Sequence, residues 1–192
     1  VGKEPPETYT ENGWIVTDNY SQPENITVTV DNFRINQPSD LTQPELGQPV
    51  GEISKASGIG SYKIKYVATD ENNNVSIPVY RLLELEDNVA PVITINGQQT
   101  INLEVYSAYN DLGARVYDNY YGQVIDQPSD YQNQPSFIIT NPVDINTLGS
   151  YIVRYNYTDP SGNQAAEKTR TINIVDTTNP VINTSAQPAL YN

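Results

Sequence analysis

Two stretches of this chain share one pattern: GSYKIKYVATDENNN at residues 60–74 and GSYIVRYNYTDPSGN at residues 149–163. In each, large apolar side chains alternate with polar ones, which is typical of a half-buried β-strand. Asp, Asn, Pro and Gly then gather in a short segment, as expected for a turn between two strands. The two stretches therefore predict the same strand and turn twice, 89 residues apart.

The alternation also predicts which side chains of the strand face the core. In the first copy, Tyr62, Ile64 and Tyr66 are expected to point inward, and Lys63 and Lys65 are expected to face solvent. No window of the chain shows the apolar spacing of an amphipathic helix. The sequence therefore predicts an all-β chain with seven or so short strands in each repeat, joined by tight turns such as the hairpin-type turn at Asn96-Gly97.

Further matches extend the internal repeat in both directions. GWIVTDNY at 13–20 returns as GARVYDNY at 113–120, and the Pro-Val-Ile that opens at Pro91 returns at Pro180. We interpret the chain as a window on a longer tandem array. The expected limits are 1–88 for the first repeat, with its N-terminal strand incomplete, 89–177 for the second, and 178–192 for the start of a third.

The composition removes most catalytic chemistries from consideration. The 192 residues include no Cys, His or Met, so the chain lacks a thiol nucleophile, the usual neutral-pH base and the commonest transition-metal ligands. Its net charge of −13 disfavours nucleic acid and anionic membranes as partners. No apolar run reaches the ~18 residues of a membrane span. We therefore expect no enzyme, no nucleic-acid binding and no membrane insertion.

The tyrosine of each Gly-Ser-Tyr carries a family resemblance. In immunoglobulin sandwiches, a tyrosine two residues before the second core cysteine hydrogen-bonds back across a corner of the sheet. Tyr62 and Tyr151 hold that position. From Pro91 to Pro180 the chain is also similar to the bacterial Ig-like surface repeats, with T-N-x-V-D, G-x-Y, T-D-x-x-G-N and D-x-T-x-P in that order.

The resemblance implies tandem immunoglobulin-like β-sandwiches placed end to end. It implies a non-catalytic segment of a surface-exposed rod, extracellular or at the cell surface, that serves as a spacer or in attachment. Its partners would be its neighbouring repeats and a protein or glycan ligand. Two alternatives stay open: Ig-like domains of a phage or viral capsid, decoration or fibre protein at the virion surface, and a carbohydrate-binding module of a secreted enzyme.

Several aromatic residues are candidates for contact with a partner or a glycan. Tyr120, Tyr121 and Tyr131 fall in predicted turns or insertions, where exposed rings could stack on sugars. The alternative is that they cap the ends of a small core. Trp14 aligns with Ala114 at an inward position, so we expect it to pack. The Pro-rich insertion at 126–135 is the first candidate for a partner contact, because loops carry function on rigid scaffolds.

A calcium site is predicted where the loops of an Ig-like sandwich converge. The B–C and F–G loops lie at the pole where the chain enters, which would bring linker and loop residues together: Asp87, Asn88, Asp118, Asn119, Asp159 and Asn163. Carboxylates, amides and carbonyls are the ligands that calcium takes. The alternative is that these residues form Asx-turns without any metal. The matched cluster of the first repeat (Asp18, Asn19 and Asp70) is expected to bind more weakly or not at all.

Overall fold

The fold is known from a computed structural model, which describes residues 8–36 and 47–182. These residues form strands and a few short 3-10 helices, so the prediction of an all-β chain is confirmed. No helix among them has the length and apolar character needed to cross a membrane. In chain order the elements are η1 (Pro23–Asn25), β1 (Thr27–Ile35), β2 (Gln48–Val50), η3 (Lys55–Ser57), β3 (Gly60–Thr69), β4 (Val79–Leu85), β5 (Val92–Ile95), β6 (Thr100–Glu104), β7 (Ala114–Asp118), β8 (Gly122–Ile125), η4 (Pro128–Asn133), β9 (Phe137–Thr140), β10 (Gly149–Tyr157) and β11 (Lys168–Val175).

The chain divides into two compact units. The first holds residues 1–90 together with the loops 118–122 and 160–163, and the second holds the remainder. The end-to-end arrangement of repeats, with limits at 88 and 177, stays a prediction. Residues 183–192 of the expected third repeat lie outside the described residues.

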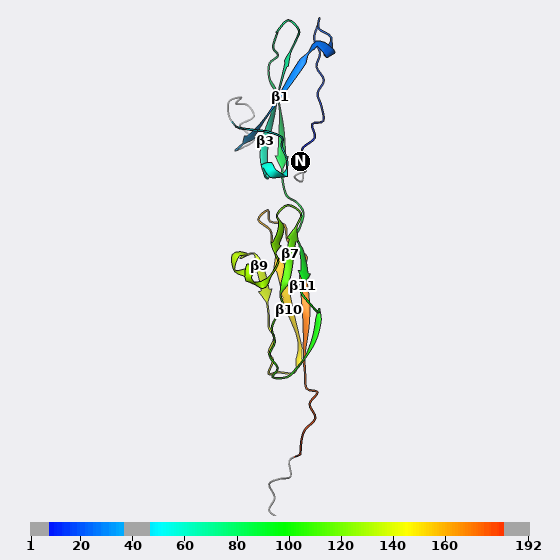
Figure 1. Cartoon of the computed structure of the whole chain (residues 1–192), viewed down its shortest axis with the longest axis vertical. Helices are drawn as coiled ribbons and strands as arrows, with labels where there is room; N and C mark the ends of the chain where they lie inside the picture. Colours follow the sequence, from blue (N-terminus) through cyan, green and yellow to red (C-terminus); the bar gives the residue numbers. More distant parts are fainter. Residues whose placement is uncertain (1–7, 37–46, 183–192) are drawn as a thin grey trace, which may run out of the picture. The chain divides into compact units, whose positions relative to one another are not determined.

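The second unit is a sandwich of two sheets (Figure 1). One sheet has the strand order β6-β11-β10-β9, and the other has the order β5-β7-β8. Alternate residues of β7 explain the packing, because Ala114 and Val116 are buried while Arg115 and Tyr117 are exposed. Side chains of both sheets form one core, which includes Ile93, Val116, Ile125, Val153, Tyr155, Tyr157, Ile172 and Ile174.

The turn at Asn96-Gly97 does not join a hairpin, which corrects the sequence-based prediction. Gly97 has φ +77°, a left-handed conformation that allows a sharp change of direction. The strand before the turn, β5, pairs with β7, whereas the strand after it, β6, pairs in parallel with β11 in the other sheet. The chain therefore changes sheets at this turn.

The first unit is built on one sheet with the order β2-β1-β3-β4. Residues 9–17 belong to no strand, although Tyr9 packs on the core and its N–H donates to the Ile53 carbonyl at 2.6 Å. The prediction of seven or so strands is therefore wrong for the described part of this unit, which has four. The buried core consists of Ile53, Tyr62, Ile64, Tyr66, Leu83 and Leu85.

Trp14 departs from its expected burial. Its side chain is about half exposed, whereas Ala114 at the matched position is fully buried. In the second unit β7 is paired with β5, but residues 13–17 have no paired strand among the described residues. The Trp14 ring packs on Tyr66 with the ring centroids 5.9 Å apart, and it is otherwise open to solvent.

Lys63 also corrects the inside–outside prediction, because it is fully buried although it alternates with the core residues of β3. Its ammonium lies 5.6 Å from the centre of the Phe33 ring and 5.3 Å from that of the Tyr80 ring. Aromatic rings attract a cation and cover its aliphatic stem. The outer face of this sheet is therefore covered at Lys63 by side chains of its neighbouring strands.

Candidate functional site

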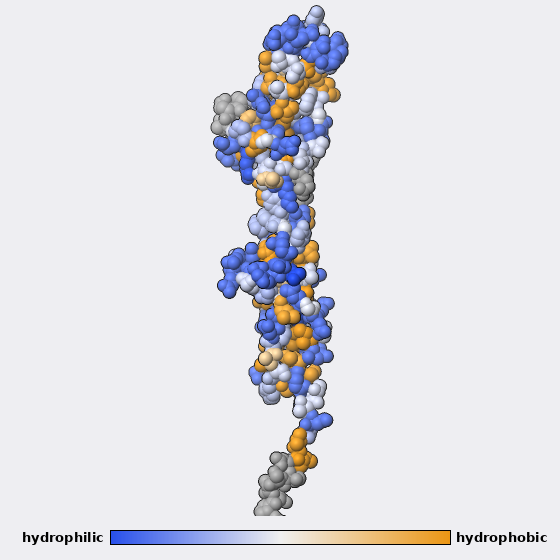
Figure 2. Space-filling view, in the orientation of Figure 1, coloured by the Kyte–Doolittle hydropathy of each residue, from blue (hydrophilic) through white to orange (hydrophobic). Residues whose placement is uncertain are grey.

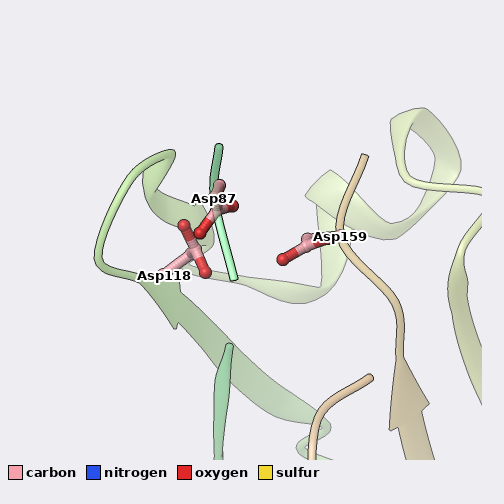
Figure 3. Close-up of side chains that lie close together, drawn as sticks. All are labelled: Asp87, Asp118 and Asp159. Carbon is pink, nitrogen blue, oxygen red and sulfur yellow. The ribbon is translucent and has the colours of Figure 1, made fainter. Parts of the chain in front are cut away.

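Two buried carboxylates of the first unit, those of Asp87 and Asp118, lie close together (Figure 3). Each offers one oxygen, and these two oxygens lie within 4.8 Å of each other. Asp159 belongs to the second unit, where it is buried as well. Asp87 and Asp118 are only 4% and 1% exposed. Carboxylates that are charged, close together and shielded from water repel one another unless a bound cation or protonation neutralises their charge.

Asp118 shows where a cation would bind. Its Oδ1 accepts hydrogen bonds from the backbone N–H groups of Tyr120 at 2.7 Å and Tyr121 at 2.8 Å. Its Oδ2 is buried and has no hydrogen-bond partner among the described residues. Figure 3 shows the carboxylate turned toward that of Asp87. Because buried polar atoms are nearly always satisfied, this oxygen points to a ligand.

The asparagines of the predicted calcium site take other partners. The Asn163 side-chain amide donates to the backbone carbonyl of Asp87 at 3.0 Å, and the backbone carbonyl of Asn119 accepts from the Lys55 ammonium at 2.6 Å. The Asn88 amide lies 3.5 Å from a carboxylate oxygen of Glu86. The structure thus brings together Asp87 and Asp118 of the predicted set, and calcium binding itself stays a prediction.

The matched residues of the first repeat make turns. Asp18 Oδ1 accepts from the backbone N–H groups of Tyr20 at 2.9 Å and Ser21 at 2.8 Å, as Asp118 does one repeat later. The Asn74 side chain and backbone, with the backbone N–H of Asn72, donate to Asp70. These donors hold the pKa of both Asp carboxyls below its usual range. Such Asx-turns require no metal.

The three tyrosines considered for partner contact have partners within the chain. The Tyr131 hydroxyl accepts from the Ala114 N–H at 2.8 Å and donates to the carbonyl of the same residue at 3.1 Å. The Tyr120 hydroxyl accepts from the Ile59 N–H at 3.2 Å, and the Tyr121 hydroxyl lies 2.9 Å from Ser161 Oγ. These contacts favour the structural interpretation, and glycan or protein contact stays a prediction.

The Pro-rich insertion contributes to the core through the same tyrosine. Tyr131 lies in η4, and its ring packs against Phe137 with the ring centroids 4.8 Å apart. Both residues belong to the core of the second unit. The insertion is therefore anchored to the sandwich at this position.

One group of side chains that occurs in both units was not predicted from the sequence: an acidic residue, an arginine and a tyrosine. In the second unit Arg170 forms an ion pair with Asp111, to which the Tyr155 hydroxyl donates at 2.7 Å. Burial, together with that hydrogen bond, raises the pKa of Tyr155. The first unit repeats the group with Arg81, Glu11 and Tyr66. The signal was present, because the two arginines are 89 residues apart, as the two Gly-Ser-Tyr stretches are.

A protein family matches the second unit. Residues 93–174 fit the model of a family described as a bacterial surface protein, Ig-like domain. This stretch is similar to the Ig-like domain of that family. The Ig-like domain therefore takes in the sandwich from β5 to β11, with Asp118, Asp159 and the buried ion pair of Arg170 inside it.

Two similar solved structures are each less than 25% identical to the chain. A lipoprotein from Bacteroides thetaiotaomicron is 24% identical over 47% of this chain and 40% of its own, with a TM-score of 0.36. Zebrafish RET cadherin-like domains 1 to 4 are 14% identical over 79% of this chain and 41% of theirs, with a TM-score of 0.22. At these scores neither likeness carries an argument. No curated protein matches the sequence.

The tyrosine near the start of β10 forms a hydrogen bond to the backbone upstream of the strand. The Tyr151 hydroxyl donates to the Thr147 carbonyl at 3.0 Å. In the first unit the Tyr62 hydroxyl donates to the carbonyls of Ser57 and Gly58, both at 2.6 Å. Each hydroxyl thus connects the strand to the turn that precedes it, as in the corner of an immunoglobulin sandwich.

Removing the Tyr151 hydroxyl is expected to destabilise the Ig-like domain modestly. Tyr151→Phe should lower the free energy of unfolding by roughly 0.5–1.5 kcal/mol, the usual net value of one hydrogen bond. Chemical denaturation followed by circular dichroism measures this loss. Tyr106→Phe, at an exposed tyrosine of the same unit, is the control and should have no effect. Equal denaturation midpoints for the two variants would show that the Tyr151 hydroxyl does not stabilise the corner of the sandwich.

Proposed function

We propose that the chain is a non-catalytic segment of a surface-exposed rod of Ig-like domains, acting as a spacer or in attachment. The observation that carries this proposal is the match of residues 93–174 to the bacterial surface Ig-like family. That family also supports a location at the surface. The proposal agrees with the absence of Cys and His from the sequence, which removes the commonest nucleophile–base pairs.

The placement of the acidic residues supports a non-catalytic role. Glycoside hydrolysis needs two carboxylates that flank a sugar in an accessible cleft. Asp87, Asp118 and Asp159 are buried, and Asp111 is engaged by Arg170 and Tyr155. These carboxylates are thus placed to bind a cation or to stabilise the fold.

The role as a rod is tested by small-angle X-ray scattering together with binding and hydrolysis assays. A spacer should show a maximum dimension close to that of two sandwiches in line. For attachment, the immobilised chain should retain bacterial cells, host glycans or host proteins. A maximum dimension typical of a compact particle would contradict the role as a rod. Hydrolysis of a glycan substrate would contradict the non-catalytic role.

We also propose that the neighbouring carboxylates of Asp87 and Asp118 bind Ca²⁺. The buried Asp118 Oδ2 supports this, because it lacks a hydrogen-bond partner in the described part of the chain and lies beside the Asp87 carboxylate. Carboxylate oxygen is a hard ligand that calcium prefers, and a divalent ion would offset the repulsion between the two charges. Isothermal titration calorimetry should show saturable heat at millimolar calcium or below. Absence of heat would leave only the turn interpretation.

A further inference from the structure

The dipeptide Asn96-Gly97 lies between β5 and β6, where the chain of the second unit passes from one sheet to the other. Asparagine is a thermally labile residue, and a following glycine makes it more so, because glycine has no side chain to hinder ring closure. Asn96 is half-buried and Gly97 is exposed. Hydrophilic residues cover much of the face of this unit drawn in Figure 2. Water, which asparagine needs as a reactant to become an acid, therefore reaches the turn.

The fold gives each residue of the dipeptide a structural role. Gly97 has φ +77°, which few other residues adopt, and a Cβ at this position would lie 2.9 Å from Leu112 Cδ1. The side-chain amide of Asn96 donates to the backbone carbonyl of Leu112 at 3.0 Å. The turn therefore depends on two residues whose combination is chemically labile.

The backbone of Asn96 is held as firmly as its side chain. Its N–H donates to the Gly113 carbonyl at 3.0 Å, and its carbonyl accepts from the guanidinium of Arg170, which is fully buried. To react, the Asn96 side chain must leave the Leu112 carbonyl so that its Cγ can approach the Gly97 nitrogen. These hydrogen bonds therefore oppose the reaction while the turn is closed, and local opening of the turn permits it.

We propose that Asn96 is a site of spontaneous deamidation that is gated by opening of this turn, and that its conversion weakens the Ig-like domain. The Gly97 nitrogen attacks Cγ of Asn96 and loses its proton, and the new C–N bond closes a succinimide ring. The side-chain nitrogen takes up that proton and leaves as ammonia. Water then opens the ring at either carbonyl, which gives aspartate or isoaspartate. Water is the only co-reactant.

Both products change the contacts that fix the turn. Aspartate has no amide hydrogen to donate to the Leu112 carbonyl, and it places a negative charge against that oxygen. Isoaspartate carries the backbone through the former side-chain carbon, so the chain is one methylene longer where it changes sheets. It also turns the carbonyl that accepts from Arg170 into a carboxylate. The inference rests on contacts within the second unit, and it is therefore independent of the proposed function and of calcium binding.

Peptide mapping by mass spectrometry follows the reaction in the whole chain, kept in mildly alkaline buffer either folded or in denaturant. In denaturant, Asn96 should be modified at a rate similar to that of Asn12, the other asparagine that glycine follows in the sequence. In the folded chain Asn96 should react about tenfold or more slowly, because only opened turns react. Equal rates at Asn96 in the two conditions, or no modification at Asn96 in denaturant, would overturn the proposal.

Thermal melting measures the consequence for stability. Wild-type chain that is aged in denaturant and refolded should melt at a lower temperature than fresh chain. Asn96→Gln is the matched variant, because glutamine must close a larger ring and does so far more slowly, whereas every other asparagine still ages. Ageing should therefore lower its melting temperature less than that of the wild type.

If Asn96→Gln fails to fold, the wild type provides the comparison by itself. Ion-exchange chromatography separates molecules that carry the new charge from those that do not, and peptide mapping assigns the charge to Asn96. The molecules modified at Asn96 should melt at the lower temperature. Equal melting temperatures of the modified and the unmodified chains would overturn the proposal.

Discussion

Asp111→Ala is expected to destabilise the Ig-like domain by about 3–5 kcal/mol, because it leaves a buried guanidinium without its counter-charge. Arg170 is fully buried. Its remaining acceptors are neutral carbonyls, including that of Gln98 at 3.1 Å, and they do not replace a carboxylate. The same substitution removes the acceptor of the Tyr155 hydroxyl. Differential scanning calorimetry of the whole chain measures the loss.

Glu11→Ala is the matched control, because the first unit carries the same combination of acid, arginine and tyrosine with its ion pair more exposed to solvent. The side chains of Arg81 and Glu11 are 38% and 22% exposed, against 0% and 14% for Arg170 and Asp111. We expect a loss of about 1–2 kcal/mol, the sum of a half-exposed ion pair and one hydrogen bond. Trp14 fluorescence follows unfolding of this unit. Equal losses in the two units would contradict the argument from burial.

The strands were predictable where the repeat and the alternation agreed. In β10, Val153 and Tyr155 are buried whereas Arg154 between them is exposed, as a period of two requires. The change of sheet at Asn96-Gly97 was not predictable, because it depends on which strands pair across the unit. The burial of Lys63 depends on rings from two neighbouring strands, so it is a tertiary effect that alternation does not encode.

The site was predictable only in part. The proximity of Asp87 and Asp118 was predictable, because the loop of Asp118 is expected at the pole of the sandwich where the chain enters and Asp87 lies in the linker. Sequence does not show which asparagines lie beside these carboxylates, because that depends on side-chain rotamers. It depends also on neighbouring cations such as Lys55, whose ammonium donates to the backbone carbonyl of Asn119. The Arg170 group is not predictable from spacing alone, because the repeat aligns Arg170 with Arg81 but does not show which acid and which tyrosine lie beside Arg170 in the core.

Calcium is expected to stabilise the wild-type chain and not the Asp118→Asn variant. A ligand that binds only the native state adds about 2.7 kcal/mol at one hundred times its dissociation constant. Asparagine keeps an oxygen for the Tyr120 and Tyr121 N–H groups, but an amide replaces the unpartnered Oδ2. In chelator the variant should be as stable as the wild type or more so, because one of two neighbouring negative charges is gone.

Asp18→Asn controls for the turn itself. Asp18 accepts the same pair of backbone hydrogen bonds as Asp118, and the described residues show no acidic cluster around it. Its substitution should leave the calcium-dependent rise in melting temperature unchanged. The measurement is thermal melting of the wild type and both variants at millimolar calcium and in chelator. If the wild type melts at one temperature in both conditions, these carboxylates act as turn residues and the calcium proposal fails.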